Sequence, residues 1–149
     1  MLYRQLDDND ASSFKKLLKV FADAFDDIDT YQGAVPRDEY LAALLAKPHI
    51  IALVAETEAG EIVGGLVAYV LEKFERERAE VYIYDLAVTE PYRRQGIATT
   101  LINTLKPIAK KHGAQVIFVQ ADRGDEPAIK LYESLGTRED VHHFDISAE

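Results

Sequence analysis

The sequence predicts a single α/β domain with a mixed, mostly antiparallel central sheet flanked by helices. Three observations lead to this prediction. Apolar, β-branched runs fill the middle of the chain, amphipathic helical patterns lie on both sides of them, and no repeat or linker interrupts the sequence. The length of 149 residues suits one ordinary domain. We therefore expect one domain over residues 1–149.

The first third of the chain predicts one strand and two helices, over residues 2–6, 14–28 and 37–46. Apolar residues recur every three or four positions from Phe14, which is the pattern of an amphipathic helix, and Asp10 or Ser12 can cap it. The acidic run 26–30 ends this helix in our prediction, although acids at a helix C-terminus oppose the helix dipole. Pro36 suits the first turn of the second helix.

Three strands follow in the middle of the chain, over residues 50–56, 62–70 and 81–88. Ala59 and Gly60 supply the turn of a hairpin between the first two strands. The charge-rich segment 72–80 predicts a solvated loop at the tip of the next hairpin.

The last third predicts alternating helices and strands, over residues 96–112, 115–121, 127–135 and 141–146. Gly113 and Gly136 end the two helices. Pro107 lies inside the first of them, where it removes a hydrogen bond to the Asn103 carbonyl and is expected to kink or shorten the helix. The strand, helix and strand in succession predict a parallel crossover.

Composition excludes several classes of function. Seventeen Lys and Arg against 26 Asp and Glu give a net charge of −9, which argues against binding nucleic acid or an anionic membrane and suits a cationic ligand. Because cysteine is absent, disulfides, thiolate metal sites and a Cys nucleophile are excluded. The four histidines lack metal-binding spacing, so we expect no metal. Neither a membrane segment nor a signal peptide is predicted, and the expected location is the cytoplasm.

The strongest chemical signal is the passage from strand 81–88 into the following helix. The loop carries Arg93 and Arg94, and small residues, Gly96 and Ala98, stand at the mouth of the helix. A helix N-terminus offers unpaired N–H groups to an anion, and small residues let the anion approach closely. The segment therefore predicts a pyrophosphate site. It lacks the glycine spacing of nucleotide-triphosphate loops and of dinucleotide-binding turns.

The pattern Arg93-x-x-Gly96-x-Ala98 after Leu86-Ala87-Val88 resembles the acetyl-coenzyme A signature of the GNAT superfamily of N-acetyltransferases. The segment 128–136 resembles the second motif of that superfamily. Longer runs resemble the aminoglycoside 3-N-acetyltransferases within it, at residues 82–88, 93–98, 119–122, 124–125 and 143–146. The resemblance covers nearly the whole chain and implies the GNAT acyltransferase fold, acetyl-coenzyme A as co-substrate and a homodimer.

The resemblance also implies roles for individual residues. The strand backbone would meet the pantetheine arm at Leu86, Ala87 and Val88. The pyrophosphate would be held by Arg93, Arg94, Gln95, Gly96, Ile97, Ala98 and Thr99. Tyr132 would protonate the departing thiolate, whereas by itself it would be read as a packing residue. The chain departs from the family where many members have Asn and this sequence has Asp125 and Glu126, and where many have an aromatic residue and this sequence has Thr137.

Asp85 is the candidate catalytic base. Simple strand alternation places it on one face with Val81, Ile83 and Ala87, and places Tyr82 and Tyr84 on the other. A carboxylate in an apolar row has a raised pKa, which suits a base, although a structural acid bonded to its neighbours is the alternative. The acidic and aromatic residues expected to meet a cationic substrate are Tyr84, Asp122, Glu139 and Asp145. For the acids the alternative is a solvated acidic face.

Together these features predict an acetyl-coenzyme A-dependent N-acetyltransferase that modifies an aminoglycoside, at the 3-amine as the resemblance implies, and so confers antibiotic resistance. Transfer should be direct, since no Cys can carry an acyl group. Two alternatives remain open. One is acetylation of a polyamine or a peptide N-terminus, and the other is a non-catalytic module that binds acyl-coenzyme A.

Overall fold

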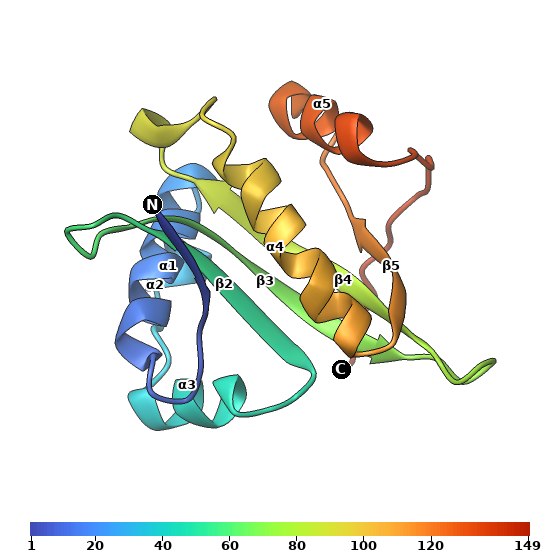
Figure 1. Cartoon of the computed structure of the whole chain (residues 1–149), viewed down its shortest axis with the longest axis horizontal. Helices are drawn as coiled ribbons and strands as arrows, with labels where there is room; N and C mark the ends of the chain where they lie inside the picture. Colours follow the sequence, from blue (N-terminus) through green and yellow to red (C-terminus); the bar gives the residue numbers. More distant parts are fainter.

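The computed structural model describes residues 1–149 and contains one five-stranded sheet in the order β1-β2-β3-β4-β5 (Figure 1). The strands are β1 (Leu2–Gln5), β2 (Ile50–Glu56), β3 (Ile62–Glu72), β4 (Ala79–Val88) and β5 (Ala114–Val119). Neighbours are antiparallel from β1 to β4, and β4 and β5 are parallel. The predicted mixed, mostly antiparallel α/β sheet is confirmed.

Helices cover both faces of the sheet (Figure 1). They are α1 (Ala11–Ala24), α2 (Ile28–Gln32), α3 (Asp38–Leu45), α4 (Ile97–Lys111) and α5 (Glu126–Leu135), with a short 3-10 turn at Glu90–Tyr92. Side chains of β2 alternate between two cores. Ile51 and Leu53 pack on the α4 side, whereas Ala52 and Val54 pack on the side of α1 and α3. The sheet therefore separates two apolar layers.

The acidic run after α1 begins a helix instead of ending one, so the prediction of one helix over 14–28 is wrong at its end. Asp26 adopts a left-handed φ of 50°, so the helix cannot continue through it and the chain changes direction there. Asp27 then caps α2, because its carboxylate accepts a hydrogen bond of 3.1 Å from the Thr30 N–H. Asp29 lies in the first turn, where the helix dipole favours an acid.

A β-bulge at Tyr84 changes the face on which Asp85 lies. Val67 pairs with Asp85 and the next residue, Ala68, pairs with Ile83, so Tyr84 has no partner in β3. Ile83 packs in the core on the α4 side, whereas Asp85 bonds to α2 on the opposite side. The extra residue shifts the alternation by one position.

The predicted face of Asp85 is therefore wrong in part. Asp85 lies on the face opposite Val81 and Ile83, and it shares its face with Ala87. Tyr82 and Tyr84, expected on the other face, lie on the same face as Asp85. Tyr84 is also near enough to Tyr31, which bonds to Asp85, to contribute to the raised pKa of the Tyr31 hydroxyl.

The predicted closing strand over 141–146 is also wrong. The chain after α5 contains no strand, and none of its backbone groups bonds to the sheet. Phe144 and Ile146 expose 80% and 90% of their surface. Their alternating apolar pattern is typical of a strand, but β5 gives them no pairing partner within the chain.

Helix α4 runs from Ile97 to Lys111 through Pro107, so the expected helix over 96–112 is confirmed and the expected shortening at Pro107 is wrong. The buried residues recur every three or four positions, at Ile97, Leu101, Ile102, Leu105 and Ala109. Pro107 and Asn103 are both exposed. The carbonyl of Asn103 that loses its partner therefore faces water, which satisfies it.

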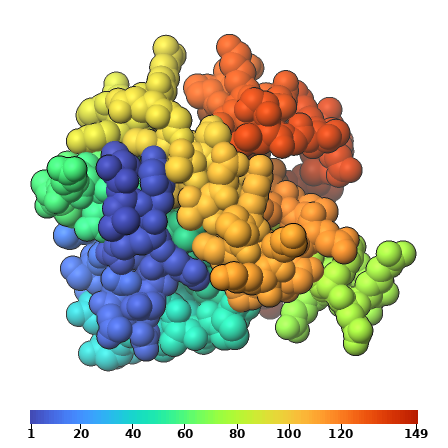
Figure 2. Space-filling view, viewed as in Figure 1, coloured from blue at the N-terminus to red at the C-terminus, as the bar shows by residue number.

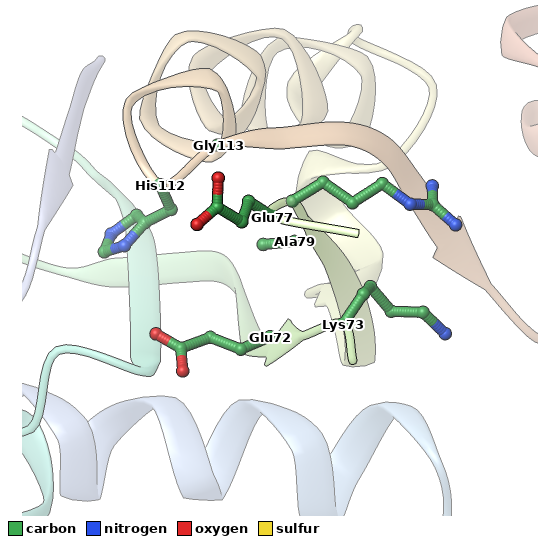
Figure 3. Close-up of a pocket in the computed structure, with 7 residues that line it drawn as sticks. Glu72, Lys73, Glu77, Ala79, His112 and Gly113 are labelled. Carbon is green, nitrogen blue, oxygen red and sulfur yellow. The ribbon is translucent and has the colours of Figure 1, made fainter. Parts of the chain in front are cut away.

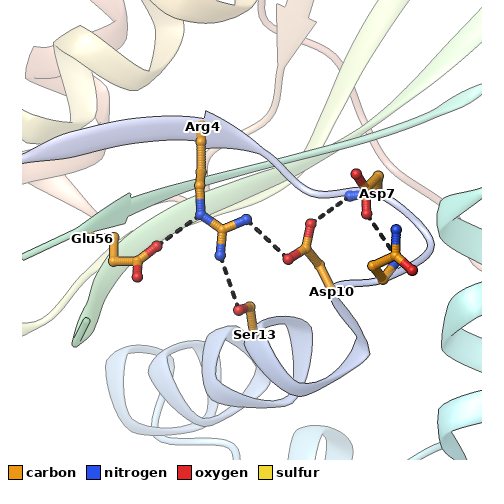
Figure 4. A network of polar contacts seen from close by, with 6 residues as sticks. Arg4, Asp7, Asp10, Ser13 and Glu56 are labelled. Carbon is orange, nitrogen blue, oxygen red and sulfur yellow. Dashed lines mark hydrogen bonds and ion pairs between the residues drawn. The ribbon is translucent and has the colours of Figure 1, made fainter.

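Arg4 connects β1 to the neighbouring elements through side-chain hydrogen bonds (Figure 4). Its guanidinium donates to the Glu56 carboxylate at 2.8 Å, to Asp10 at 3.0 Å and to the Ser13 hydroxyl at 3.1 Å. Burial tends to raise the pKa of Asp10, but hydrogen bonds from the Asp7 N–H and from Arg4 outweigh it and lower that pKa. One side chain thus joins β1, β2 and the start of α1.

Candidate active site

An opening between β4 and β5 defines the candidate site. The two strands pair only from Ala79 to Ile83 of β4, yet β4 continues to Val88. Beyond this point β5 leads away towards α5, while β4 runs on beside β3 (Figure 1). The backbone of residues 84–88 therefore has no strand neighbour on its β5 side, so its main-chain groups on this side are free for a ligand, apart from the Val88 carbonyl, which accepts a hydrogen bond from Arg93.

The start of α4 adds an anion-binding surface at the same end of β4. None of the backbone N–H groups of residues 94–99 donates a hydrogen bond within the chain. Gly96 caps the helix with a left-handed φ of 78°, and a Cβ atom there would meet no atom within 4 Å. Free N–H groups, the helix dipole and an open approach favour a pyrophosphate at this position.

The two arginines of the loop differ in their surroundings. The Nε of Arg93 donates to the Val88 carbonyl at 2.9 Å, so this side chain ties the loop to the end of β4. Arg94 has a left-handed φ of 60° and forms no ion pair or side-chain hydrogen bond. Gln95 donates to the Pro91 carbonyl at 3.3 Å. Arg94 is thus the guanidinium most available to an anion.

Asp85 is a half-buried carboxylate without a cationic partner. Its Oδ2 accepts a hydrogen bond of 2.8 Å from the Tyr31 hydroxyl, and no Lys or Arg pairs with it. Burial raises the pKa of Asp85, and the hydrogen bond from Tyr31 works against this rise. An unpaired carboxylate at an opening can receive a cation.

Four aromatic rings lie in a chain beside Asp85, and we call them the aromatic row: Tyr69, Tyr84, Tyr82 and Phe118. Tyr69 and Tyr84 meet edge to face at 5.8 Å, and Tyr84 and Tyr82 at 5.7 Å. Tyr82 stacks on Phe118 at 4.7 Å. Tyr84 is exposed and Tyr69 and Tyr82 are half-buried, and accessible tyrosine faces suit both sugar rings and ammonium groups.

Tyr132 of α5 packs against the apolar layer on the α4 side and is near enough to Asp85 for that carboxylate to influence its hydroxyl. Burial raises the pKa of its hydroxyl to about 12, with smaller contributions from Asp125 and Asp85. The hydroxyl therefore stays protonated at neutral pH and is available as a hydrogen-bond donor. Figure 2 shows α5, in orange-red, and the loop before α4, in yellow, on either side of a notch at one end of the molecule.

The remaining acids expected to contact substrate lie outside this arrangement. Asp122 is exposed just after β5, and Glu139 and Asp145 are exposed in the segment after α5. Asp145 pairs with His143 at 2.9 Å. Neither Glu139 nor Asp145 flanks a strand, so their roles stay predictions that the geometry does not strengthen.

Sequence reasoning missed Tyr31. This residue lies 54 positions from Asp85 and reaches it only through α2, a helix that the prediction left out. A usable signal was present, because an Asp that can cap a helix, Asp27, followed by an acid in the first turn, Asp29, is typical of a helix N-terminus.

A charged cavity of about 300 Å³ lies at the opposite end of α4 (Figure 3). It is lined by Glu72, Lys73, Glu77, Arg78, Ala79, His112 and Gly113. The basic side chains here already have acidic partners: Arg78 pairs with Glu75 at 2.8 Å and with Glu80 at 3.3 Å, and Lys73 pairs with the same two acids. The two acids of this cavity that form no ion pair, Glu72 and Glu77, are exposed to solvent, whereas Asp85 is half-buried.

The family model of the acetyltransferase (GNAT) family matches residues 15–137. This chain belongs to the GNAT family. Members of the family use acetyl-coenzyme A, and the free N–H groups of residues 94–99 fit its pyrophosphate. No three His, Cys, Asp or Glu side chains of this acetyltransferase gather where they could share a metal ion, and no helix is long and apolar enough to span a membrane.

Solved structures similar to this GNAT acetyltransferase include two from uncultured soil metagenomic samples. One is an aminoglycoside acetyltransferase, 53% identical with a TM-score of 0.96, and the match covers 99% of this chain and 98% of the other. The second is an aminoglycoside acetyltransferase in complex with sisomicin, 34% identical with a TM-score of 0.90, covering 99% and 96%.

Sequence relatives of this GNAT acetyltransferase are named for a different substrate, the N-terminal amine of a protein. N-alpha-acetyltransferase 30 of Schizosaccharomyces pombe is 42% identical over 55 residues, which are 37% of each chain. An N-alpha-acetyltransferase of Saccharolobus solfataricus is 40% identical over 55 residues. These matches span about a third of the relatives' length, 37% and 33%.

Proposed function

We propose that this GNAT acetyltransferase moves the acetyl group of acetyl-coenzyme A to an amine of an aminoglycoside, at the 3-amine as the family resemblance implies. The observation that carries the proposal is the unpaired, half-buried carboxylate of Asp85 beside the aromatic row. A polycationic, sugar-based acceptor matches both features. Full-length similarity at 53% identity to an aminoglycoside acetyltransferase supports the same acceptor.

The donor side of the site is built from main chain. The pantetheine arm would lie along the free edge of Leu86–Val88, and the pyrophosphate would meet the N–H groups of residues 94–99 with help from Arg94. Arg93 keeps the loop in place through its bond to the Val88 carbonyl. Acetyl-coenzyme A supplies an activated acetyl thioester, so the chain need only position it, polarise it and manage protons.

On the acceptor side, Asp85 accepts a proton from the substrate ammonium, directly or through a water molecule. The freed amine then attacks the thioester carbonyl, a C–N bond forms and the C–S bond breaks. Tyr132 donates its proton to the departing sulfur, and the second proton that the nitrogen loses as the amide forms restores the Tyr132 hydroxyl. The products are a neutral amide, the free thiol and one proton, which Asp85 returns to solvent. The transfer is direct because the chain has no cysteine.

The consequence for the drug is a loss of charge. Each acetylated amine can no longer become an ammonium, so it loses its positive charge and all but one of its N–H donors. We propose that this confers resistance, and that the enzyme acts in the cytoplasm on a small cationic substrate, with no nucleic acid, membrane or metal required. The homodimer implied by the family resemblance remains a prediction, which light scattering on the purified chain would test.

A thiol-release assay with a panel of amines tests the proposal. The protein is incubated with acetyl-coenzyme A and, in separate reactions, gentamicin, kanamycin, sisomicin, spermidine and a peptide with a free N-terminus. We expect release with the aminoglycosides, and an NMR spectrum of the product should show the acetyl group on the 3-amine. Absence of release with every aminoglycoside would overturn the proposal.

The same panel addresses the alternatives. The local matches to N-alpha-acetyltransferases favour a peptide acceptor as the second candidate. Release with the peptide or with spermidine alone would assign the chain to one of those acceptors. Tight binding of acetyl-coenzyme A, measured by calorimetry, without turnover on any amine would indicate a non-catalytic module.

A further inference from the structure

Tyr31 is the only residue whose side chain forms a hydrogen bond with Asp85, and the reaction proposed for Asp85 and Tyr132 assigns it no role. We propose that Tyr31 is a positioning residue, whose hydroxyl holds the Asp85 carboxylate ionised and correctly oriented for the substrate amine. This inference rests on the proposed function, since it presumes that Asp85 receives the proton of the amine.

The position of the Tyr31 hydroxyl is fixed by packing. The ring lies 5.7 Å from the ring of Phe21, which is fully buried in α1, and 5.7 Å from the ring of Phe25. The backbone below it is held by the Asp27 cap of α2. An aromatic ring packed against two others has little freedom to turn away, so the hydrogen bond to Asp85 is preorganised.

The hydrogen bond leaves half of the carboxylate available. Oδ2 of Asp85 accepts from Tyr31 at 2.8 Å, and Oδ1 accepts no hydrogen bond within the chain. Since a carboxylate can accept several hydrogen bonds at once, Oδ1 is free for the substrate ammonium while Oδ2 stays anchored. A base with one anchored oxygen presents the other in a defined direction.

No cation of the chain competes with Tyr31 for Asp85. The titratable groups near this carboxylate, or near the tyrosines that face it, come from α1–α2 and α3 (Asp27, Tyr31 and Tyr40), from β3 and β4 (Tyr69, Tyr82 and Tyr84), and from α5 and the residue before it (Asp125 and Tyr132). All are acids or phenols. The phenol of Tyr31 is thus the single donor in the chain that favours the charged form of Asp85, and bonds to an ionised acceptor are about twice as strong as neutral ones.

The variant Tyr31→Phe tests this role, because it removes the hydroxyl and keeps the ring that packs on Phe21. Without its donor, Asp85 should hold its proton to higher pH. We expect the acidic limb of the kcat/KM profile for the aminoglycoside to move up by about one pH unit, which is about a tenfold loss of rate at the acidic end. The KM for acetyl-coenzyme A should not change.

Two further variants separate positioning from packing. Tyr3→Phe removes a hydroxyl from β1, far from Asp85, and should leave the profile where it is. Incorporation of 3-fluorotyrosine at position 31 makes the phenol a stronger donor, so the acidic limb should move to lower pH, opposite to Tyr31→Phe. The pKa of Asp85, measured by NMR from the chemical shift of its carboxyl carbon, should rise in Tyr31→Phe and fall with 3-fluorotyrosine. This measurement does not depend on turnover.

The outcomes distinguish this inference from the proposed function. If Asp85→Asn remains fully active, the assignment of the base fails and the role of Tyr31 falls with it. If Asp85→Asn is inactive, but the Tyr31→Phe profile and carboxyl titration coincide with those of the unmodified chain, only the inference about Tyr31 is overturned.

Discussion

The ring of Tyr82 stacks on the ring of Phe118, with 4.7 Å between their centroids and 4° between their planes. The two residues are partners in the register of β4 and β5, and one more pair, Ile83 with Val119, follows before the strands part. The Tyr82 hydroxyl also donates to Gln120 at 3.1 Å, just beyond the end of β5. This stack therefore lies next to the point where the strands part and the opening of the candidate site begins.

Replacing Phe118 should weaken the packing between β4 and β5 at the point where the two strands part. For Phe118→Ala we expect a loss of about 1–2 kcal/mol in the free energy of unfolding, below the value for a fully buried ring, because Phe118 is only half-buried. The KM for acetyl-coenzyme A should rise several-fold. Val116→Ala, in the exposed part of the same strand, is the control and should leave this KM unchanged. Equal KM values for both variants would contradict the argument.

Gly96 and Gly113 form a matched pair at the two ends of α4. Both have a left-handed φ, 78° and 82°, and a Cβ atom at either position would meet no atom within 4 Å. Alanine at either site should therefore cost a similar backbone strain of about 1 kcal/mol, seen in thermal unfolding. Only Gly96→Ala should raise the KM for acetyl-coenzyme A, because its methyl group would project where the pyrophosphate is expected. A rise with Gly113→Ala as well would point to a general effect on α4.

Asp85 should reduce the stability of the fold at neutral pH. Burial raises its pKa above the ordinary value of 3.8, so the folded chain binds this proton more tightly than the unfolded chain does. The contribution of Asp85 to stability is therefore full below pH 3.8 and falls as the pH rises through the folded-state pKa.

The variant Asp85→Asn should consequently be more stable than the unmodified chain at pH 7, by on the order of 0.5–1 kcal/mol, while losing most of its turnover. Its amide oxygen can still accept the hydrogen bond from Tyr31. Thermal unfolding at several pH values should show the difference shrinking as the pH falls towards 4. A variant that is less stable than the unmodified chain at pH 7 would refute this expectation.

Tyr132 should affect the chemical step more than binding. The raised pKa, about 12, keeps the hydroxyl protonated, and Tyr132→Phe removes it while preserving the packing of the ring. We expect kcat to fall by about 100-fold, at the lower end of the range for a positioned proton donor, with both KM values nearly unchanged. Tyr92→Phe, on the 3-10 turn before α4, is a comparison with the same chemical change. An unaltered kcat in Tyr132→Phe would leave Tyr132 a packing residue.

The regular elements of the fold could be predicted because their signals are local. The apolar periodicity of α4 and the β-branched runs of β2 and β3 depend only on nearby residues, and these elements begin and end within two residues of their predicted limits. The segment 141–146 has an equally good local pattern but is no strand, since pairing needs a neighbour and the chain provides none. Local pattern is thus necessary for a strand and not sufficient.

The site could be predicted only where it is continuous in sequence. The loop and the start of α4 follow from one motif, whereas the different surroundings of Arg93 and Arg94 depend on how the loop folds back on Val88. The face of Asp85 depends on the bulge. Its trace in the sequence is weak: Ile83 and Leu86, which both pack on the α4 side, are three residues apart instead of two.

The opening between β4 and β5 divides the proposed site by chemistry, with main chain on the donor side and side chains on the acceptor side. Most substitutions leave backbone N–H groups in place, so they are hard to lose by point mutation. Tyr69, Tyr84 and Asp85 can each be exchanged by a single event. An acetyltransferase built this way can change its preferred amine while its acyl donor stays the same, and substitutions in the aromatic row would change that preference first.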